Sequence, residues 1–261
     1  MTHEILKPPP TSARIALGLT GTSIPTREHL RFQLDHALAR DAVNAELDVP
    51  LLMRGLAQRD LECLSLHSAV HHASGKHERQ SYLLRPDLGR RLSPASRELL
   101  EQHAAHATPD VVFVLADGLS AVAVERHALP LLEATLHLLG SEAWTLAPVC
   151  VVTHGRVAIG DDIGQILGAR LAVVLLGERP GLSSADSLGA YLTWNPVPGR
   201  TDADRNCISN IRAEGLSYAA AAKRLAFYLS EARRRGLTGT ALKQDLPAES
   251  LTGNGNLTGS A

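Results

Sequence analysis

Aromatic residues are scarce in this chain of 261 residues, because Phe, Tyr and Trp together make up only 3% of it. The core must therefore be built from Leu, Val, Ile and Ala. Single-stranded nucleic acids stack on aromatic platforms, which are nearly absent. The formal net charge is −1, with 26 Lys and Arg against 27 Asp and Glu, so no positive field attracts phosphates. Both shortages argue against a nucleic-acid partner.

Long apolar runs and paired cysteines are also missing. No stretch approaches the roughly 20 apolar residues that span a bilayer. The N-terminal stretch "MTHEILKPPPTSAR" lacks the basic start and apolar segment of a signal peptide. Cys63, Cys150 and Cys207 have no CxxC spacing, which favours reduced thiols over disulfides or a zinc site. We therefore expect no membrane partner and a cytoplasmic location.

Known catalytic signatures are absent as well. The chain has no G-x-S-x-G, no P-loop, no H-E-x-x-H and no evident pair of nucleophile and base, so we expect no catalytic residue on it. A group of histidines invites a metal site, but Ser68 stands where a zincin needs Glu, and no third ligand offers itself. We expect a solvated loop and no metal there; the histidines are His67, His71, His72 and His77.

Apolar periodicity divides the chain into two parts. Residues 1–107 are expected to be mostly helical behind a Pro-rich leader, with one helix capped by Ser93. Residues 108–245 alternate strands with helices, and the tail 246–261 is expected to be disordered. This alternation predicts an α/β fold with a doubly wound, mostly parallel sheet. The expected strands are 110–118, 144–153, 169–177 and 187–196, and the following helices are 120–140, interrupted near Pro130, 160–168 and 217–235.

Polar residues gather where the predicted strands end, which is where open α/β sheets bind ligands. Asp117 ends the first strand, and it is either a turn residue or part of a site. Glu178 and Arg179 follow the third strand, and they form either a structural salt bridge or a site. The polar segment 199–211 is expected to return to the same edge, and its desolvation cost favours a site.

A further polar stretch, "RPDLGRRLS", lies before the first of these strands and carries three arginines. Guanidinium groups bind carboxylates and phosphates through two parallel hydrogen bonds. The stretch is therefore either a binding or interface segment or a solvated loop. Its arginines are Arg85, Arg90 and Arg91.

Blocks from about residue 10 to about residue 243 resemble the small subunit of ethanolamine ammonia-lyase. They include "YLLRPDLGRRLS", "ADGLSA", "GRVAIGDDIGQILGA", "GERPGLSSADSLGAYLTW" and "DRNCISNI". The resemblance implies a cobalt-containing, adenosylcobalamin-dependent lyase that converts ethanolamine into acetaldehyde and ammonia. It also implies a large subunit, a TIM barrel that binds ethanolamine and hosts the reaction, and a hetero-oligomer of both subunits. The chain alone should then be inactive.

On this resemblance, a Rossmann-like domain at 108–245 holds the corrin of base-on adenosylcobalamin at the interface with the large subunit. Three cofactor contacts carry over to this sequence: Val157, Glu178 and Cys207. A competing interpretation is a non-catalytic scaffold that stabilises the large subunit. Leu19 departs from the family, whose members generally have Arg there. Some relatives have a long N-terminal extension that addresses a bacterial microcompartment; about ten residues precede the first block here, so cytoplasm is the default expectation.

Overall fold

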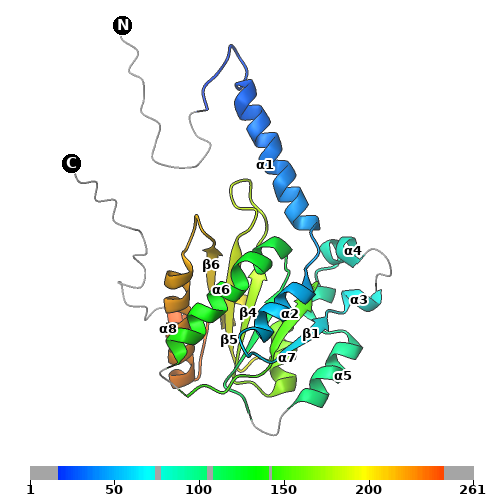
Figure 1. Ribbon diagram of the computed structural model, residues 1–261, viewed down its shortest axis with the longest axis vertical. Coiled ribbons are helices and arrows are strands. Elements are labelled where there is room, and N and C mark those ends of the chain that lie inside the picture. The colour runs from blue at the N-terminus through cyan, green and yellow to red at the C-terminus, as the bar shows by residue number, and fades with distance from the viewer. Residues whose placement is uncertain (1–16, 74–77, 105–107, 141–142, 244–261) are drawn as a thin grey trace, which may run out of the picture.

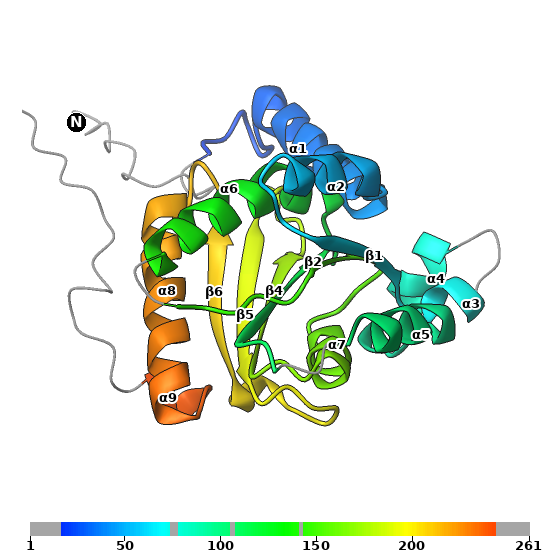
Figure 2. The same cartoon turned by 60° about the horizontal axis from the view of Figure 1, so that its bottom comes forward.

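The computed structural model describes residues 17–73, 78–104, 108–140 and 143–243. The expected leader and the expected disordered tail lie outside the described residues. The described chain folds into three layers, in which a central six-stranded sheet has helices on both faces (Figures 1 and 2). The predicted class, α/β with a mostly parallel sheet after a helical region, is confirmed.

The sheet has the strand order β1-β3-β2-β4-β5-β6. Strands β1 to β4 are parallel to one another, and β5 runs antiparallel to both β4 and β6. Every residue of β2 and β4 is buried, which explains their continuous apolar sequences. The strands are β1 (Cys63–His67), β2 (Val111–Ala116), β3 (Val149–Thr153), β4 (Leu171–Gly177), β5 (Leu188–Trp194) and β6 (Arg205–Ile211).

Two strands were not predicted from the sequence. Strand β1 lies in the region expected to be mostly helical, and it pairs with β3 along one side of the sheet. Strand β6 occupies most of the polar segment 199–211, which was expected to be a loop at the edge marked by Glu178. Because β5 is antiparallel, residues 199–204 begin at the opposite end of the sheet, and only the end of β6 returns to Glu178.

The helices cover the two faces of the sheet unequally (Figure 2). The cap predicted at Ser93 is confirmed, and Ser120 caps α6 in the same way, since each side chain accepts a backbone N–H from the first turn. Pro130 lies within one continuous helix and does not interrupt it, contrary to expectation. One face carries α2 (Val49–Ala57), α6 (Ala121–Leu139), α8 (Tyr218–Arg235) and the short α9 (Thr240–Lys243); the other carries α5 (Pro94–His103) and α7 (Ile159–Leu167).

Short elements connect β1 to α5, and their residues line part of the two cavities described below. They are α3 (Val70–Ala73), α4 (Glu78–Leu84) and the 3-10 turn η1 (Leu88–Arg90), and a second such turn, η2 (Asp202–Asp204), precedes β6. None of the helices in the described part of the chain is long and apolar enough to cross a membrane.

Helix α1 (Thr26–Asn44) projects away from the rest of the molecule (Figure 1). Leu30, Leu34 and Leu38 recur every four residues and therefore share one side of the helix, yet they are 57%, 59% and 50% exposed. Ala42 is the one residue of α1 that is buried within the described structure. The leucine side of this helix thus packs into no core within the described part of the chain.

The uneven cover leaves part of the sheet open. Helix α7 packs closely on β4, because a Cβ at Gly160 would collide with Val174. The helices that contact β5 and β6 most extensively are α6, α8 and α9, which belong to the opposite face. On the α7 side, Tyr191 of β5 and Cys207 of β6 are therefore only half-buried. This open face of β4, β5 and β6 is the candidate site.

Candidate functional site

The open face brings Glu178 and Cys207 together around Tyr191. Cys207 pairs with Tyr191 across β5 and β6. Burial raises the pKa of the Tyr191 phenol, and both Cys207 and Glu178 add to that rise. Val157 lies in the turn before α7, on the side of Leu176, and packs with Tyr191 against the same core cluster. Glu178 and Cys207 thus border one surface, and Val157 packs against the core cluster that Tyr191 also contacts.

Glu178 follows β4 and is fixed by two hydrogen bonds to one of its oxygens. Its Oε2 accepts the hydroxyl of Ser187 and, at 3.2 Å, the backbone N–H of Asn210. Its Oε1 has no hydrogen-bond partner among the residues that the structure describes, and Glu178 forms no ion pair with Arg179. The salt-bridge interpretation of this loop is therefore wrong, and a half-buried carboxylate oxygen is left free to accept.

Gly189 of β5 lets the Tyr191 ring and the Glu178 side chain lie close against the strand. A Cβ at this position would lie 2.9 Å from Cε2 of Tyr191 and 3.0 Å from Oε1 of Glu178. The sequence reasoning missed Gly189 and Tyr191, because a strand pattern alone gives both residues a structural role. The alternation of residues 187–196, which puts both on one face, was the available signal.

A cavity of about 480 Å³ adjoins this face next to Val157. Its lining combines three segments that are far apart in the sequence, at residues 86–90, 156–158 and 200–205. Arg205, the first residue of β6, is held in place by a buried bidentate ion pair with Asp161 of α7. The lining residues are Pro86, Arg90, Arg156, Val157, Ala158, Leu176, Arg200, Thr201, Asp202 and Arg205.

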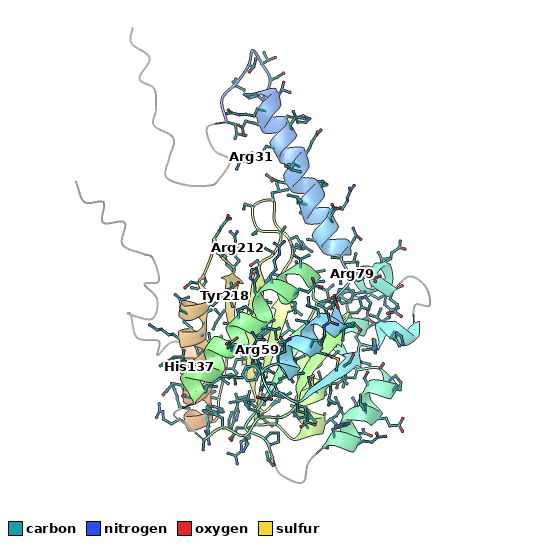
Figure 3. The ribbon with its side chains drawn as sticks, viewed as in Figure 1. Arg31, Arg59, Arg79, His137, Arg212 and Tyr218 are labelled. Carbon is teal, nitrogen blue, oxygen red and sulfur yellow. The ribbon has the colours of Figure 1, made fainter. Side chains whose placement is uncertain are left out.

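A second cavity of about 530 Å³ lies at the ends of β1, β2 and β3, and Asp117 borders it. Asp117 is 2% exposed and accepts from Arg79 Nη1 at 2.9 Å and from the Gly155 N–H at 3.0 Å. Burial raises the pKa of Asp117 to about 6, against the opposing effect of Arg79. Arg79 lies where α4 and the end of α1 meet the sheet (Figure 3). Asp117 is therefore an internal ion-pair partner and not simply a turn residue.

Histidines line the same cavity, but they are paired with their own chain. His67 ends β1, is half-buried and stacks on His71 at 4.5 Å, so it does not lie in the solvated loop that was expected. Glu78 contacts His71 at 2.8 Å and His154 at 3.5 Å. Burial lowers the pKa of His67 and lowers that of His154 to about 4. His77 and the side chain of His72 lie outside the described residues.

No group of three His, Cys, Asp or Glu side chains within the described ranges is arranged to hold a metal ion. None of the three cysteines forms a disulfide, and Cys150 is buried. Fold and site thus define a class: an α/β protein whose mostly parallel sheet leaves one face of β4, β5 and β6 uncovered.

Comparison with known proteins gives this class a family. The model of the ethanolamine ammonia-lyase light chain family (EutC) matches residues 7–243, so the chain belongs to that family. A protein of Azotobacter vinelandii named ethanolamine ammonia-lyase small subunit is 53% identical over 248 residues, which cover 94% of this chain and 90% of the relative.

Relatives with the same name occur in other species. That of Pseudomonas paraeruginosa is 53% identical over 251 residues, covering 95% of this chain and 90% of the relative. That of Pseudomonas fluorescens strain Pf0-1 is 54% identical over 243 residues, covering 92% and 86%. The family resemblance predicted from the sequence blocks is confirmed.

Proposed function

We propose that this chain is the small subunit of an adenosylcobalamin-dependent ethanolamine ammonia-lyase and that its open face holds the corrin. The reaction converts ethanolamine into acetaldehyde and ammonia. The observation that carries the proposal is the surface around Gly189, where a missing side chain, the half-buried Cys207 and the free oxygen of Glu178 adjoin one another.

The residues fit the chemistry of a corrin. A corrin has flat, apolar faces and a rim of neutral amides, so it needs a surface free of projecting side chains and flanked by hydrogen-bond acceptors. Gly189 and the small side chain of Cys207 supply the surface without projecting side chains, with Val157 as an apolar border. Oε1 of Glu178 supplies the hydrogen-bond acceptor, because a carboxylate oxygen accepts strongly from an amide N–H.

In this mechanism, bound adenosylcobalamin supplies radicals through homolysis of its cobalt–carbon bond, which is chemistry that side chains cannot perform. This chain contributes binding and orientation: Glu178 fixes the rim, Val157 and Cys207 support the ring, and the apolar contacts exclude water. We propose base-on binding, because the chain has no D-x-H-x-x-G sequence whose histidine would replace the cofactor's own base.

The proposed partner is a large subunit, a TIM barrel that binds ethanolamine and closes over the other side of the corrin in a hetero-oligomer. The exposed leucines of α1 favour such a partner, because isolated chains rarely leave a contiguous apolar stripe in water. The proposed location is the cytoplasm, with a bacterial microcompartment as the alternative. A scaffold role alone would account for α1, but not for the small residues around Glu178.

The test is co-expression with the candidate large subunit, followed by titration of the purified complex with adenosylcobalamin. We expect a saturable change in the cobalamin absorption spectrum and ethanolamine deamination by the complex. The small subunit alone should produce no acetaldehyde. A complex that assembles but binds no cobalamin, or a small subunit that deaminates ethanolamine by itself, would refute the proposal.

A further inference from the structure

Four arginines line the cavity beside Val157, and two of them are neutralised by their own chain. Arg205 donates to both oxygens of Asp161, at 2.8 and 2.6 Å. Arg200 donates twice to the carbonyl of Asn195, at 3.1 Å each, and lies 3.9 Å from Asp204. These contacts account for the charges of both side chains within the protein.

The other two arginines, Arg90 and Arg156, have no such partners. Neither guanidinium has a carboxylate or a hydrogen-bond acceptor among the residues that the structure describes. Arg156 stacks on the ring of Tyr82, 4.4 Å from its centroid, and its Nε is buried without a partner. A buried donor without an acceptor costs stability, and the stacking on Tyr82 offsets that cost by holding the guanidinium on the cavity wall.

The two unmatched arginines are held on one wall by the backbone. The N–H of Arg156 donates to the carbonyl of Gly89 at 2.7 Å, next to Arg90 in the chain. A Cβ at Gly89 would lie 2.8 Å from the carbonyl oxygen of His154 and from the ring of Tyr82, so only glycine permits this approach. Asp202 is the one carboxylate among the lining residues described. The cavity therefore carries an excess of positive charge.

We infer that Arg90 and Arg156 bind the phosphodiester of the cofactor's nucleotide tail, an inference that rests on the proposed function. Guanidinium groups match the oxygens of a phosphate bidentately. The side chains around a corrin are neutral amides, and the phosphodiester is the anionic group of cobalamin. The tail leaves the ring on the face opposite the reacting one, and the proposed function places the reacting face on the large subunit, so the tail would lie on the side of this chain. The cavity adjoins Val157, so a corrin on the open face brings the tail within its reach.

The test uses the complex with the large subunit and compares two ligands by absorption titration. Cobalamin has the phosphodiester, whereas cobinamide lacks the whole nucleotide tail. We expect Arg90→Gln to weaken cobalamin binding about tenfold and to leave cobinamide binding unchanged. Arg156→Gln should do the same, and since Arg156 also stacks on Tyr82, the exposed Arg90 is the decisive variant. The matched control is Arg91→Gln, which removes the same charge one residue away and outside the cavity.

A third arm adds inorganic phosphate, which should compete with cobalamin and not with cobinamide. Equal losses for both ligands, or no loss for either, would overturn the inference. The inference would also be overturned if phosphate stabilised the complex in a way that depends on Arg90 while the affinity for cobalamin did not depend on Arg90. The cavity would then bind a free anion and not the cofactor's tail. A wild-type complex that binds neither ligand would instead refute the proposed function, so the two failures are distinguishable.

Discussion

Arg205 and Asp161 form a buried bidentate ion pair between the start of β6 and the first turn of α7. The two side chains are 3% and 2% exposed, and Nη1 of Arg205 also donates to Thr193 of β5 at 2.7 Å. The pair therefore joins the strand that carries Cys207 to the helix that follows Val157. It fixes the distance between two borders of the open face.

Breaking this pair should destabilise the fold strongly. We expect Asp161→Leu to lower the free energy of unfolding by about 3–5 kcal/mol, because Arg205 would remain as an unpaired buried charge. Urea denaturation followed by circular dichroism measures the change. Glu133→Leu is the control, since Glu133 is 62% exposed in its pair with Arg59 and should matter far less. Equal effects of both substitutions would contradict a structural role for the buried pair.

Removing the Glu178 carboxylate should separate cofactor binding from assembly. We expect Glu178→Ala to weaken cobalamin binding by the complex about tenfold, because an amide of the corrin would lose its charged acceptor. Size-exclusion chromatography should show an intact complex. Glu214→Ala is the control, since this carboxylate is 84% exposed and pairs with Arg212. Loss of assembly with unchanged cobalamin affinity would instead favour the scaffold interpretation.

Adding a methyl group at Gly189 should also weaken cofactor binding. The new Cβ would press on the Tyr191 ring and the Glu178 carboxylate, both of which would have to move. We expect Gly189→Ala to lower the affinity of the complex for cobalamin while the sheet still forms. Gly140→Ala is the control, because its Cβ would lie at an ordinary 3.4 Å from the nearest carbonyl oxygen. Unchanged affinity in Gly189→Ala would show that the corrin lies elsewhere.

The fold could be predicted where burial is complete. Strands β2 and β4 are buried on both faces, so their sequences are continuously apolar and unambiguous. Strand β6 was missed because Arg205 and Asn206 are polar, yet both are buried through distant partners, Asp161 and Gly239. A pattern along the chain contains no information on such partners. The antiparallel direction of β5 was missed for the same reason, since it depends on pairing with β4.

In the site, too, local features could be predicted from the sequence and contacts with distant residues could not. Glu178 could be located because it ends a buried strand, where ligands of open sheets bind. Its partners could not, because Ser187 and Asn210 lie 9 and 32 residues further along the chain. The meeting of Arg90 with Arg156 depends on the close approach at Gly89. Residues of one motif are thus predictable, and contacts between motifs are not.

The leucine stripe of α1 should be needed for assembly. We expect the triple variant Leu30→Gln, Leu34→Gln, Leu38→Gln to lose most of its co-purification with the large subunit, because exposed apolar area would no longer be buried there. Glutamine preserves helix propensity, so α1 itself should persist. The control is Leu84→Gln with Leu138→Gln, which are 73% and 41% exposed on other helices. Normal co-purification of the triple variant would show that α1 is not the interface.

His154 should make the stability of the chain depend on pH. Its pKa is lowered to about 4, chiefly by burial and further by Arg79, whereas an unfolded histidine titrates near 6.5. Between these values the unfolded chain binds the extra proton, so the free energy of unfolding should fall as pH is lowered from about 6.5 toward 4. This contribution is fully present above the unfolded pKa.

The matched variant for this test is His154→Asn, because His154 has a positive φ of 57° and Asn tolerates that conformation better than most residues. We expect the variant to lose less stability than the wild type over this pH range, as measured by urea denaturation at several pH values. Asp117 acts in the opposite direction, since its raised pKa favours the folded state on acidification through about pH 6. Comparing variant with wild type removes that shared contribution, and identical pH profiles would exclude His154 as the titrating group.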